Sequence, residues 1–192
     1  FANKKLGRKT KTAVFFGDGA MDEGVFWESL NMACLWKVPI IFVCEDNDLA
    51  IHTPKSKRQG YTSAVNVVSN FACTVFNLES TDPEEVYLVT RKAIAGMREN
   101  QQPVFMRCAY YRYLEHVGVN YDFRAGYRSE TEFKKWLERD PVKIQREKLL
   151  KNGAEKELLR VEKEIDDLIE AGWQKALQAE FPDEKEIYQG GE

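Results

Sequence analysis

The sequence is poor in the residues that most often build metal centres and redox sites, since its 192 residues include only two histidines and four cysteines. The cysteines, Cys34, Cys44, Cys73 and Cys108, lie far apart, and no two have the spacing of a zinc knuckle or a dithiol motif. Three of them lie in strongly apolar surroundings. We therefore expect buried, reduced thiols, which favour a cytoplasmic protein.

The sequence also lacks a large excess of one charge and a long apolar run. The formal net charge is −3, which gives no reason to expect nucleic acid or an anionic membrane as a partner. No apolar run approaches the roughly 20 residues that a membrane-spanning helix requires. The glycine patterns of dinucleotide-binding and Walker loops are missing too. These absences leave a globular protein of ordinary composition.

Strand and helix patterns are present, and they alternate along the first two thirds of the chain. We expect fully buried strands at Thr12–Phe16 and Val38–Cys44, because both are continuous apolar or β-branched runs. Between them, residues 22–36 have helical periodicity. The apolar positions of this helix are Val25, Phe26, Leu30, Ala33 and Leu35.

The same pattern repeats further along. The dipeptide Asp82-Pro83 predicts a helix start, and this helix carries Val86, Val89, Ala93 and Met97 inward and ends near Asn100. Strands are expected on either side of it, at residues 73–78 and 104–110. Alternating strands and helices with short connections predict an α/β fold with a parallel sheet flanked by helices.

The character of the chain changes after residue 113. Residues 114–128 predict a long loop, and loops of that length are usually functional or disordered. A capping box at Ser129–Glu132 and the pair Asp140-Pro141 then predict helices, followed by an apolar stripe from Leu158 to Leu177. We expect an α/β domain at 1–128 and a helical C-terminal extension at 129–192 that packs on that domain or on a partner subunit. Because the chain begins at Phe1 and reaches a core strand after about ten residues, we expect a piece of a longer protein whose N-terminal part is missing.

Polar side chains follow two of the expected strands. Asp18 comes directly after the first strand and Asn47 follows the second. The carboxyl ends of neighbouring parallel strands share one edge of a sheet, where ligands bind, and Mg²⁺ prefers carboxylate and amide oxygens together with substrate phosphates. Gly19 and Ala20 open the next helix, where backbone N–H groups favour phosphate. A Gly-Asp-Gly turn alone is equally compatible with ordinary turn chemistry.

The combination resembles a known family. The stretch "GDGAMDEGVFWESLNMACLWKVPIIFVCEDN" is similar to the thiamine diphosphate motif, and "QPVFMRCAYYRYLEH", "YRSETEF" and "DPVKIQREKLL" resemble the α subunit of the first component of 2-oxo acid dehydrogenase complexes. The resemblance implies that Mg²⁺ is bound by Asp18, Asn47 and the carbonyl of Leu49, and that Gly19 and Ala20 contact thiamine diphosphate. It also implies that His116 faces the reactive end of the cofactor.

The resemblance implies a reaction and partners as well. It predicts decarboxylation of a 2-oxo acid with acyl or aldehyde transfer, in an assembly of two α and two β subunits that can include a lipoyl acyltransferase. The activating glutamate is expected on the β-type partner, so the chain alone should be inactive. Acetoin cleavage, ketol transfer, or an inactive assembly module that keeps the fold are the alternatives.

Three positions depart from the family pattern. Asp46 stands where an asparagine is usual, and Leu49 stands where a tyrosine is common, although only its backbone would bind the metal. Val117 follows His116 in place of a serine that is phosphorylated in some members, so we expect that control to be absent.

Overall fold

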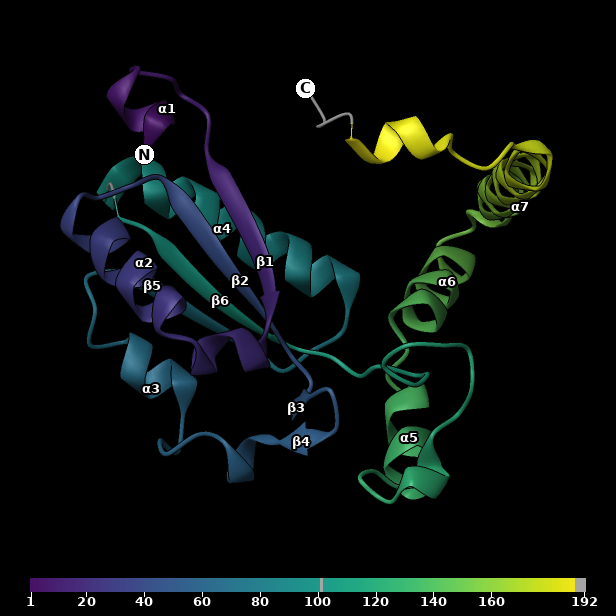
Figure 1. The fold of residues 1–192 in the computed structure, drawn as a ribbon, viewed down its shortest axis with the longest axis horizontal. Helices are drawn as coiled ribbons and strands as arrows, with labels where there is room; N and C mark the ends of the chain where they lie inside the picture. Colours follow the sequence, from purple (N-terminus) through teal and green to yellow (C-terminus); the bar gives the residue numbers. More distant parts are fainter. Residues whose placement is uncertain (101, 189–192) are drawn as a thin grey trace. The chain divides into compact units, whose positions relative to one another are not determined.

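The computed structural model describes residues 1–100 and 102–188, and the chain divides into two compact units, Phe1–Gln145 and Arg146–Glu192 (Figure 1). The division between these units falls inside the helix α6 (Pro141–Lys151). The domain boundary that the sequence analysis expects between residues 128 and 129 stays a prediction.

The first unit is built on a four-stranded parallel sheet, which confirms the predicted fold class. Its strands are β1 (Thr12–Gly17), β2 (Ile40–Asp46), β5 (Thr74–Leu78) and β6 (Val104–Ala109), in the order β1-β2-β6-β5. All three pairings are parallel, and Gly17 of β1 lies opposite Glu45 of β2. The carboxyl ends of β1 and β2 are therefore neighbours, as the sequence analysis requires for a shared site.

Helices cover both faces of this sheet. On one face, α2 (Gly24–Leu35) and α3 (Ala64–Val68) enclose a core that includes Phe42 and Phe105. On the other face, α4 (Pro83–Asn100) packs through Val86, Val89, Ala93 and Met97, as predicted. Figure 1 shows α2 and α4 on opposite sides of the strands. Strands β2, β5 and β6 therefore alternate their side chains between two cores.

The prediction of a fully buried first strand was wrong. Residues 12–17 do form β1, but Phe15 is 65% exposed and Val14 is 37% exposed. The cause is topological, because β1 is the edge strand of the sheet and pairs only with β2. An apolar run indicates a strand that can be buried on both faces, and it does not say which elements of the same chain cover it.

Helix α2 also differs from the expectation in detail. It begins at Gly24, after the 3₁₀ turn η1 (Asp18–Asp22), and its buried apolar positions include Phe26, Leu30 and Ala33. Val25 and Leu35 are 65% and 70% exposed. They lie about 100° around the helix from Phe26 and Cys34, which places them beside the buried stripe.

Several short elements at the carboxyl edge of the sheet were not predicted. After β2 the chain forms a small antiparallel hairpin from β3 (Leu49–Ala50) and β4 (Thr53–Pro54), followed by the 3₁₀ turn η2 (Lys55–Lys57). Asp48 and Ile51 have φ angles of 68° and 56°, so the hairpin turns tightly at positions without glycine.

The segment after β6 forms the predicted long connection. It contains only the 3₁₀ turn η3 (Phe123–Ala125) before α5 (Glu130–Leu137). Ser129 is confirmed as the N-cap of α5, since its hydroxyl oxygen accepts a hydrogen bond from the Glu132 backbone N–H at 3.1 Å. The reciprocal bond of the predicted capping box, from the Ser129 N–H to the Glu132 side chain, stays a prediction. At the other end of the chain's first unit, the short helix α1 (Ala2–Lys5) precedes β1.

The second unit is helical, as expected for this part of the sequence. It contains the end of α6, the long helix α7 (Glu155–Gln178) and the 3₁₀ turn η4 (Glu184–Tyr188). Gly153, with a φ of 74°, ends α6 as the pair Asn152-Gly153 predicts. No residue of α7 is buried, and Leu168 and Ile169 on its apolar side are 73% and 66% exposed. The surface on which this helix packs stays a prediction.

The cysteines are free thiols, but only part of the prediction about their burial holds. Cys34 and Cys44 are buried, whereas Cys73 and Cys108 are half-buried. Burial raises the pKa of all four thiols, and that of Cys73 to about 12. Among the residues that the structure describes, no helix combines the length and apolar character needed to cross a membrane.

Candidate functional site

Asp18 and Gly19 stand at the point where β1 passes into η1. Asp18 is only 2% exposed. Gly19 lies so close to β3 that an added Cβ would be 2.8 Å from the Cβ of Ala50, well inside van der Waals contact. Glycine is therefore required here by packing, and the close approach brings the Gly-Asp-Gly turn against Leu49–Ala50. Two of the expected site segments, far apart in sequence, meet at this point.

The Asp18 carboxylate has one paired and one unpaired oxygen. Its Oδ2 accepts a hydrogen bond from Arg58 Nη2, while Oδ1 is buried without a hydrogen-bond partner in the described part of the chain. Burial is the main cause that raises the pKa of Asp18, and the neighbouring Asp46 raises it further, against the lowering effect of Arg58. A buried carboxylate oxygen with no partner is costly, and such atoms frequently mark a position that an absent ion or water fills.

Asp46, at the end of β2, differs from Asp18 because both of its carboxylate oxygens accept hydrogen bonds. Its Oδ2 accepts hydrogen bonds from Lys55 Nζ at 2.7 Å and Arg107 Nε at 2.6 Å, and its Oδ1 accepts one from the Asp48 backbone N–H at 3.1 Å. Burial by itself would raise the pKa of Asp46, but the hydrogen bonds from Lys55 and Arg107 outweigh it and lower the pKa. Asp46 is therefore held as a fully paired carboxylate and is not free to bind a metal.

Asn47 and Leu49 form the turn that leads into β3. The Asn47 side-chain oxygen accepts a hydrogen bond from the Leu49 N–H at 3.1 Å, and its Nδ2 donates to the Tyr110 hydroxyl at 3.1 Å. These two bonds fix the orientation of the amide group. A cavity of about 70 Å³ adjoins Asn47 and Leu49, and Arg112 and Arg128 also line it.

His116 lies on the exposed connection after β6, and it is linked to the same edge by one arginine. Arg112 Nη1 lies 3.1 Å from His116 Nδ1 and donates to the Ile51 carbonyl at 3.5 Å. The histidine is thus tied to the hairpin that carries Leu49, although it is not in contact with Asp18 in any described interaction. The role expected for His116 stays a prediction.

The sequence analysis missed the buried ion pair that holds this connection in place. Arg128 Nη2 lies 2.5 Å from Asp122 Oδ1, and the two side chains are 2% and 7% exposed. Arg128 also donates to the Leu114 carbonyl at 2.9 Å, and Arg112 donates to the Tyr127 hydroxyl at 2.8 Å. The only sequence signal was the position of these arginines inside the "YRY" and "YRSETEF" segments, which says nothing about their partners.

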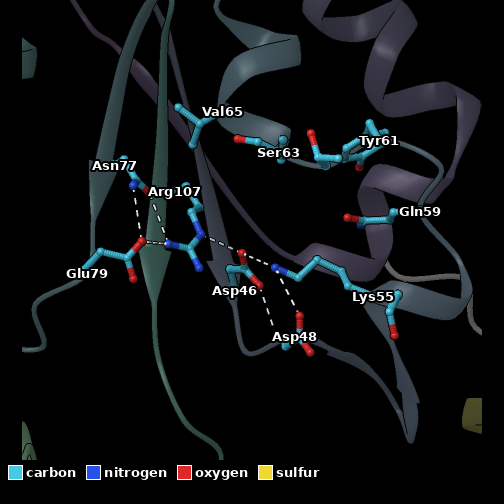
Figure 2. Close-up of a pocket in the computed structure, with 13 residues that line it drawn as sticks. Asp46, Asp48, Lys55, Gln59, Tyr61, Ser63, Val65, Asn77, Glu79 and Arg107 are labelled. Carbon is cyan, nitrogen blue, oxygen red and sulfur yellow. Dashed lines mark hydrogen bonds and ion pairs between the residues drawn. The ribbon is translucent and has the colours of Figure 1, made fainter.

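A cavity of about 510 Å³ lies beside Asp46 (Figure 2). Figure 2 shows Arg107 between Asp46 on one side and Asn77 and Glu79 on the other, and Lys55 between Asp46 and Asp48. The charged side chains of its wall are thus paired with one another. Asp18, Asn47, Leu49 and His116 do not line this cavity.

The described residues contain no group of three or more histidine, cysteine, aspartate or glutamate side chains placed to hold a metal ion. The metal site expected from the sequence would use one carboxylate, one side-chain amide and one backbone carbonyl. It therefore does not need a cluster of three such side chains. The structure brings Asp18, Gly19, Asn47 and Leu49 to one edge of the sheet.

Comparisons with known proteins place this geometry in context. A family model described as "Dehydrogenase E1 component" matches residues 1–185. The pyruvate dehydrogenase E1 component subunit alpha of Rickettsia felis is 30% identical over 190 residues, which cover 98% of this chain and 57% of the relative. The same subunit of Rhizobium meliloti is 30% identical over 191 residues, 98% of this chain and 54% of the relative. The chain therefore spans about half the length of the curated relatives it matches.

A solved structure of a transketolase from Leishmania mexicana is also similar, with 22% identity and a TM-score of 0.44 over 51% of this chain and 15% of that one. A likeness of that size carries no argument about function.

Proposed function

Because the chain belongs to the dehydrogenase E1 component family, we propose that it is part of the α-type subunit of a thiamine diphosphate-dependent 2-oxo acid dehydrogenase. The observation that carries this proposal is the family match over residues 1–185, together with Asp18 and Asn47 at the adjacent ends of β1 and β2. The α-type assignment is supported by relatives that are themselves named alpha subunits.

The residues at this edge fit a magnesium–diphosphate group. Asp18 Oδ1 is buried and lacks a partner within the described chain, as expected of an oxygen that a cation would bind. A carboxylate, an amide oxygen and a backbone carbonyl are hard ligands of the type Mg²⁺ prefers when phosphates complete its shell. We propose that Asp18, Asn47 and the Leu49 carbonyl bind Mg²⁺, and that the backbone of Gly19 and Ala20 contacts the diphosphate.

The protein's own part in the reaction is to hold and orient. Thiamine diphosphate supplies the nucleophilic carbon for decarboxylation of a 2-oxo acid when it is bound. Asp18 and Asn47 would hold the diphosphate end of the cofactor through the metal, and the backbone of Gly19 would lie beside the phosphates. His116, held by Arg112, would bind phosphate or assist acyl transfer at the other end of the cofactor. The identity of the 2-oxo acid would be determined by testing the assembled enzyme against a panel of 2-oxo acids and acetoin.

We propose a β-type thiamine enzyme subunit as the partner, with a lipoyl acyltransferase as the acyl acceptor. The exposed apolar side chains of β1 support the presence of a further protein surface, since parallel sheets are normally covered on both faces. A cytoplasmic location is proposed on cysteine usage alone.

Calorimetric titration of the full-length protein with its partner tests the proposal. Thiamine diphosphate with Mg²⁺ should bind, and Asp18→Ala should abolish binding because the only carboxylate of the proposed metal site is lost. Asp48→Asn is the matched control. It removes a carboxylate two-thirds exposed on the same turn, outside the proposed ligand set, and asparagine tolerates the positive φ at that position. Absence of binding by the wild-type assembly, or full binding by Asp18→Ala, would contradict the proposal.

A further inference from the structure

The basic segment that follows β4 lies directly over the carboxylates of the candidate site. Lys55 pairs with Asp46, Arg58 pairs with both Asp18 and Asp22, and Gln59 Nε2 donates to Asp22 Oδ1 at 2.9 Å and to the Asp18 carbonyl at 3.3 Å. Residues 55–59 therefore neutralise the acidic groups at the ends of both strands. The proposed magnesium site does not account for this arrangement.

Arg58 is the member of this segment that occupies Asp18. Its side chain is only 11% exposed, and its Nε donates to the Thr53 carbonyl at 2.9 Å, so the guanidinium has a fixed direction. Nη2 then reaches Asp18 and Nη1 reaches Asp22. A guanidinium is always charged, and its planar donors suit two carboxylates at once.

A divalent cation and this guanidinium are both positively charged and are both attracted to the Asp18 carboxylate. Arg58 holds Oδ2 of Asp18 and Oδ1 has no partner in the described chain, so a metal at Oδ1 would share one carboxylate with the guanidinium. The side chain is 3% exposed, so water offers little screening of the repulsion between the two cations. The guanidinium has a second partner in Asp22, which is more exposed at 23%. Arg58 can therefore release Asp18 and still keep one ion pair, which gives the side chain two alternative positions.

We propose that Arg58 is the built-in counter-cation of this site. In the absence of metal it neutralises Asp18, and it is displaced toward Asp22 and Gln59 when Mg²⁺ binds. Arg58 thereby stabilises the metal-free protein and weakens its affinity for the metal. This inference rests on the proposed magnesium site, and it assigns a competing cation to that site.

Loss of Arg58 should lower the stability of the metal-free protein and raise its affinity for Mg²⁺. A residue with a purely structural role would not produce both changes. In Arg58→Gln, the metal-free protein should melt at a lower temperature, because a buried carboxylate is left without its partner. The same variant should bind Mg²⁺ about tenfold more tightly, because the competing charge-assisted hydrogen bond is gone. A residue that only supports the fold would lower the melting temperature and leave metal affinity unchanged or weaker.

The experiment is a calorimetric titration of Mg²⁺ into the full-length protein with its partner subunit, at a fixed saturating concentration of thiamine diphosphate. It is paired with thermal melting of each protein without metal. Lys57→Gln is the matched control, since Lys57 is exposed, forms no ion pair within the described residues, and carries the same charge on the same segment. Lys57→Gln should leave both measurements close to those of the wild type.

Arg58→Lys is the second variant, and it keeps the experiment decisive if Arg58→Gln does not fold. Lysine keeps the charge but cannot reach two carboxylates with a planar fork, so metal affinity should lie between those of wild type and Arg58→Gln. Affinity that is unchanged or weaker in the Arg58 variants, or an equal increase in Lys57→Gln, would overturn the inference alone. No binding of Mg²⁺ and cofactor by the wild type and the variants alike would overturn the proposed function as well.

Discussion

Two aspartates at the ends of neighbouring strands show how strongly the surroundings of a carboxyl group change its pKa. Asp18 and Asp46 are both nearly fully buried, yet the pKa of Asp18 is raised and that of Asp46 is lowered. The difference comes from pairing, because Asp46 accepts hydrogen bonds from two cationic side chains and Asp18 from one. The carboxylate with the less complete pairing is the one with an oxygen left for a metal.

Gly19 gives a prediction at the same scale. Gly19→Ala places a methyl group 2.8 Å from the Ala50 Cβ, so we expect it to lower the free energy of unfolding by about 1–3 kcal/mol and to displace η1 from β3. Gly60→Ala is the control, because an added Cβ there meets no atom within 4 Å. Urea denaturation measures both. Equal stabilities for the two variants would show that η1 does not depend on this close approach.

At the scale of elements, local sequence signals and tertiary contacts contribute differently. The caps and stops of α5 and α6 are local and were predicted from Ser129 and from Asn152-Gly153. The hairpin β3–β4 was not predicted, because it depends on positive φ angles at Asp48 and Ile51, where glycine would be expected. Two local hydrogen bonds hold that turn, from the Asp48 N–H to Asp46 Oδ1 and from the Leu49 N–H to Asn47 Oδ1.

The cap of α5 can be tested directly. Ser129→Ala removes the acceptor for the Glu132 N–H, so the free energy of unfolding of the first unit should fall by about 1 kcal/mol. Ser129→Asp should retain most of that stability, since aspartate is an equally good N-cap. Chemical denaturation followed by tryptophan fluorescence is suitable because Trp136 lies in α5. If alanine and aspartate behave alike, the cap does not contribute.

At the scale of the whole molecule, each of the two units carries large exposed apolar side chains. Phe15 of β1 is 65% exposed, and α7 has no buried residue, although both sequences have the apolar content of packed elements. The chain spans about half the length of the curated relatives it matches. The proposed β-type partner is expected to cover part of this apolar surface.

Hydrogen exchange tests this expectation for the edge strand. In the 192-residue chain, amides of β1 should exchange faster than those of β2, because β1 pairs on one side only. In the full-length protein with its partner, protection of β1 should rise toward that of β2. Equal protection of β1 in the short chain and in the assembly would mean that nothing covers this edge.

The sequence by itself determined the parallel α/β pattern, the starts of α4, α5 and α6, the ends of α4 and α6, and the pair Asp18 and Asn47 at strand ends. These follow from local periodicity and turn chemistry, which neighbouring residues fix. Only the tertiary structure decided that β1 is an edge strand, that Asp46 is paired with Lys55 and Arg107, and that Arg58 occupies Asp18. Those outcomes depend on contacts between residues 9 to 61 positions apart, and no local pattern in the chain records which charged side chains will meet once the sheet has formed.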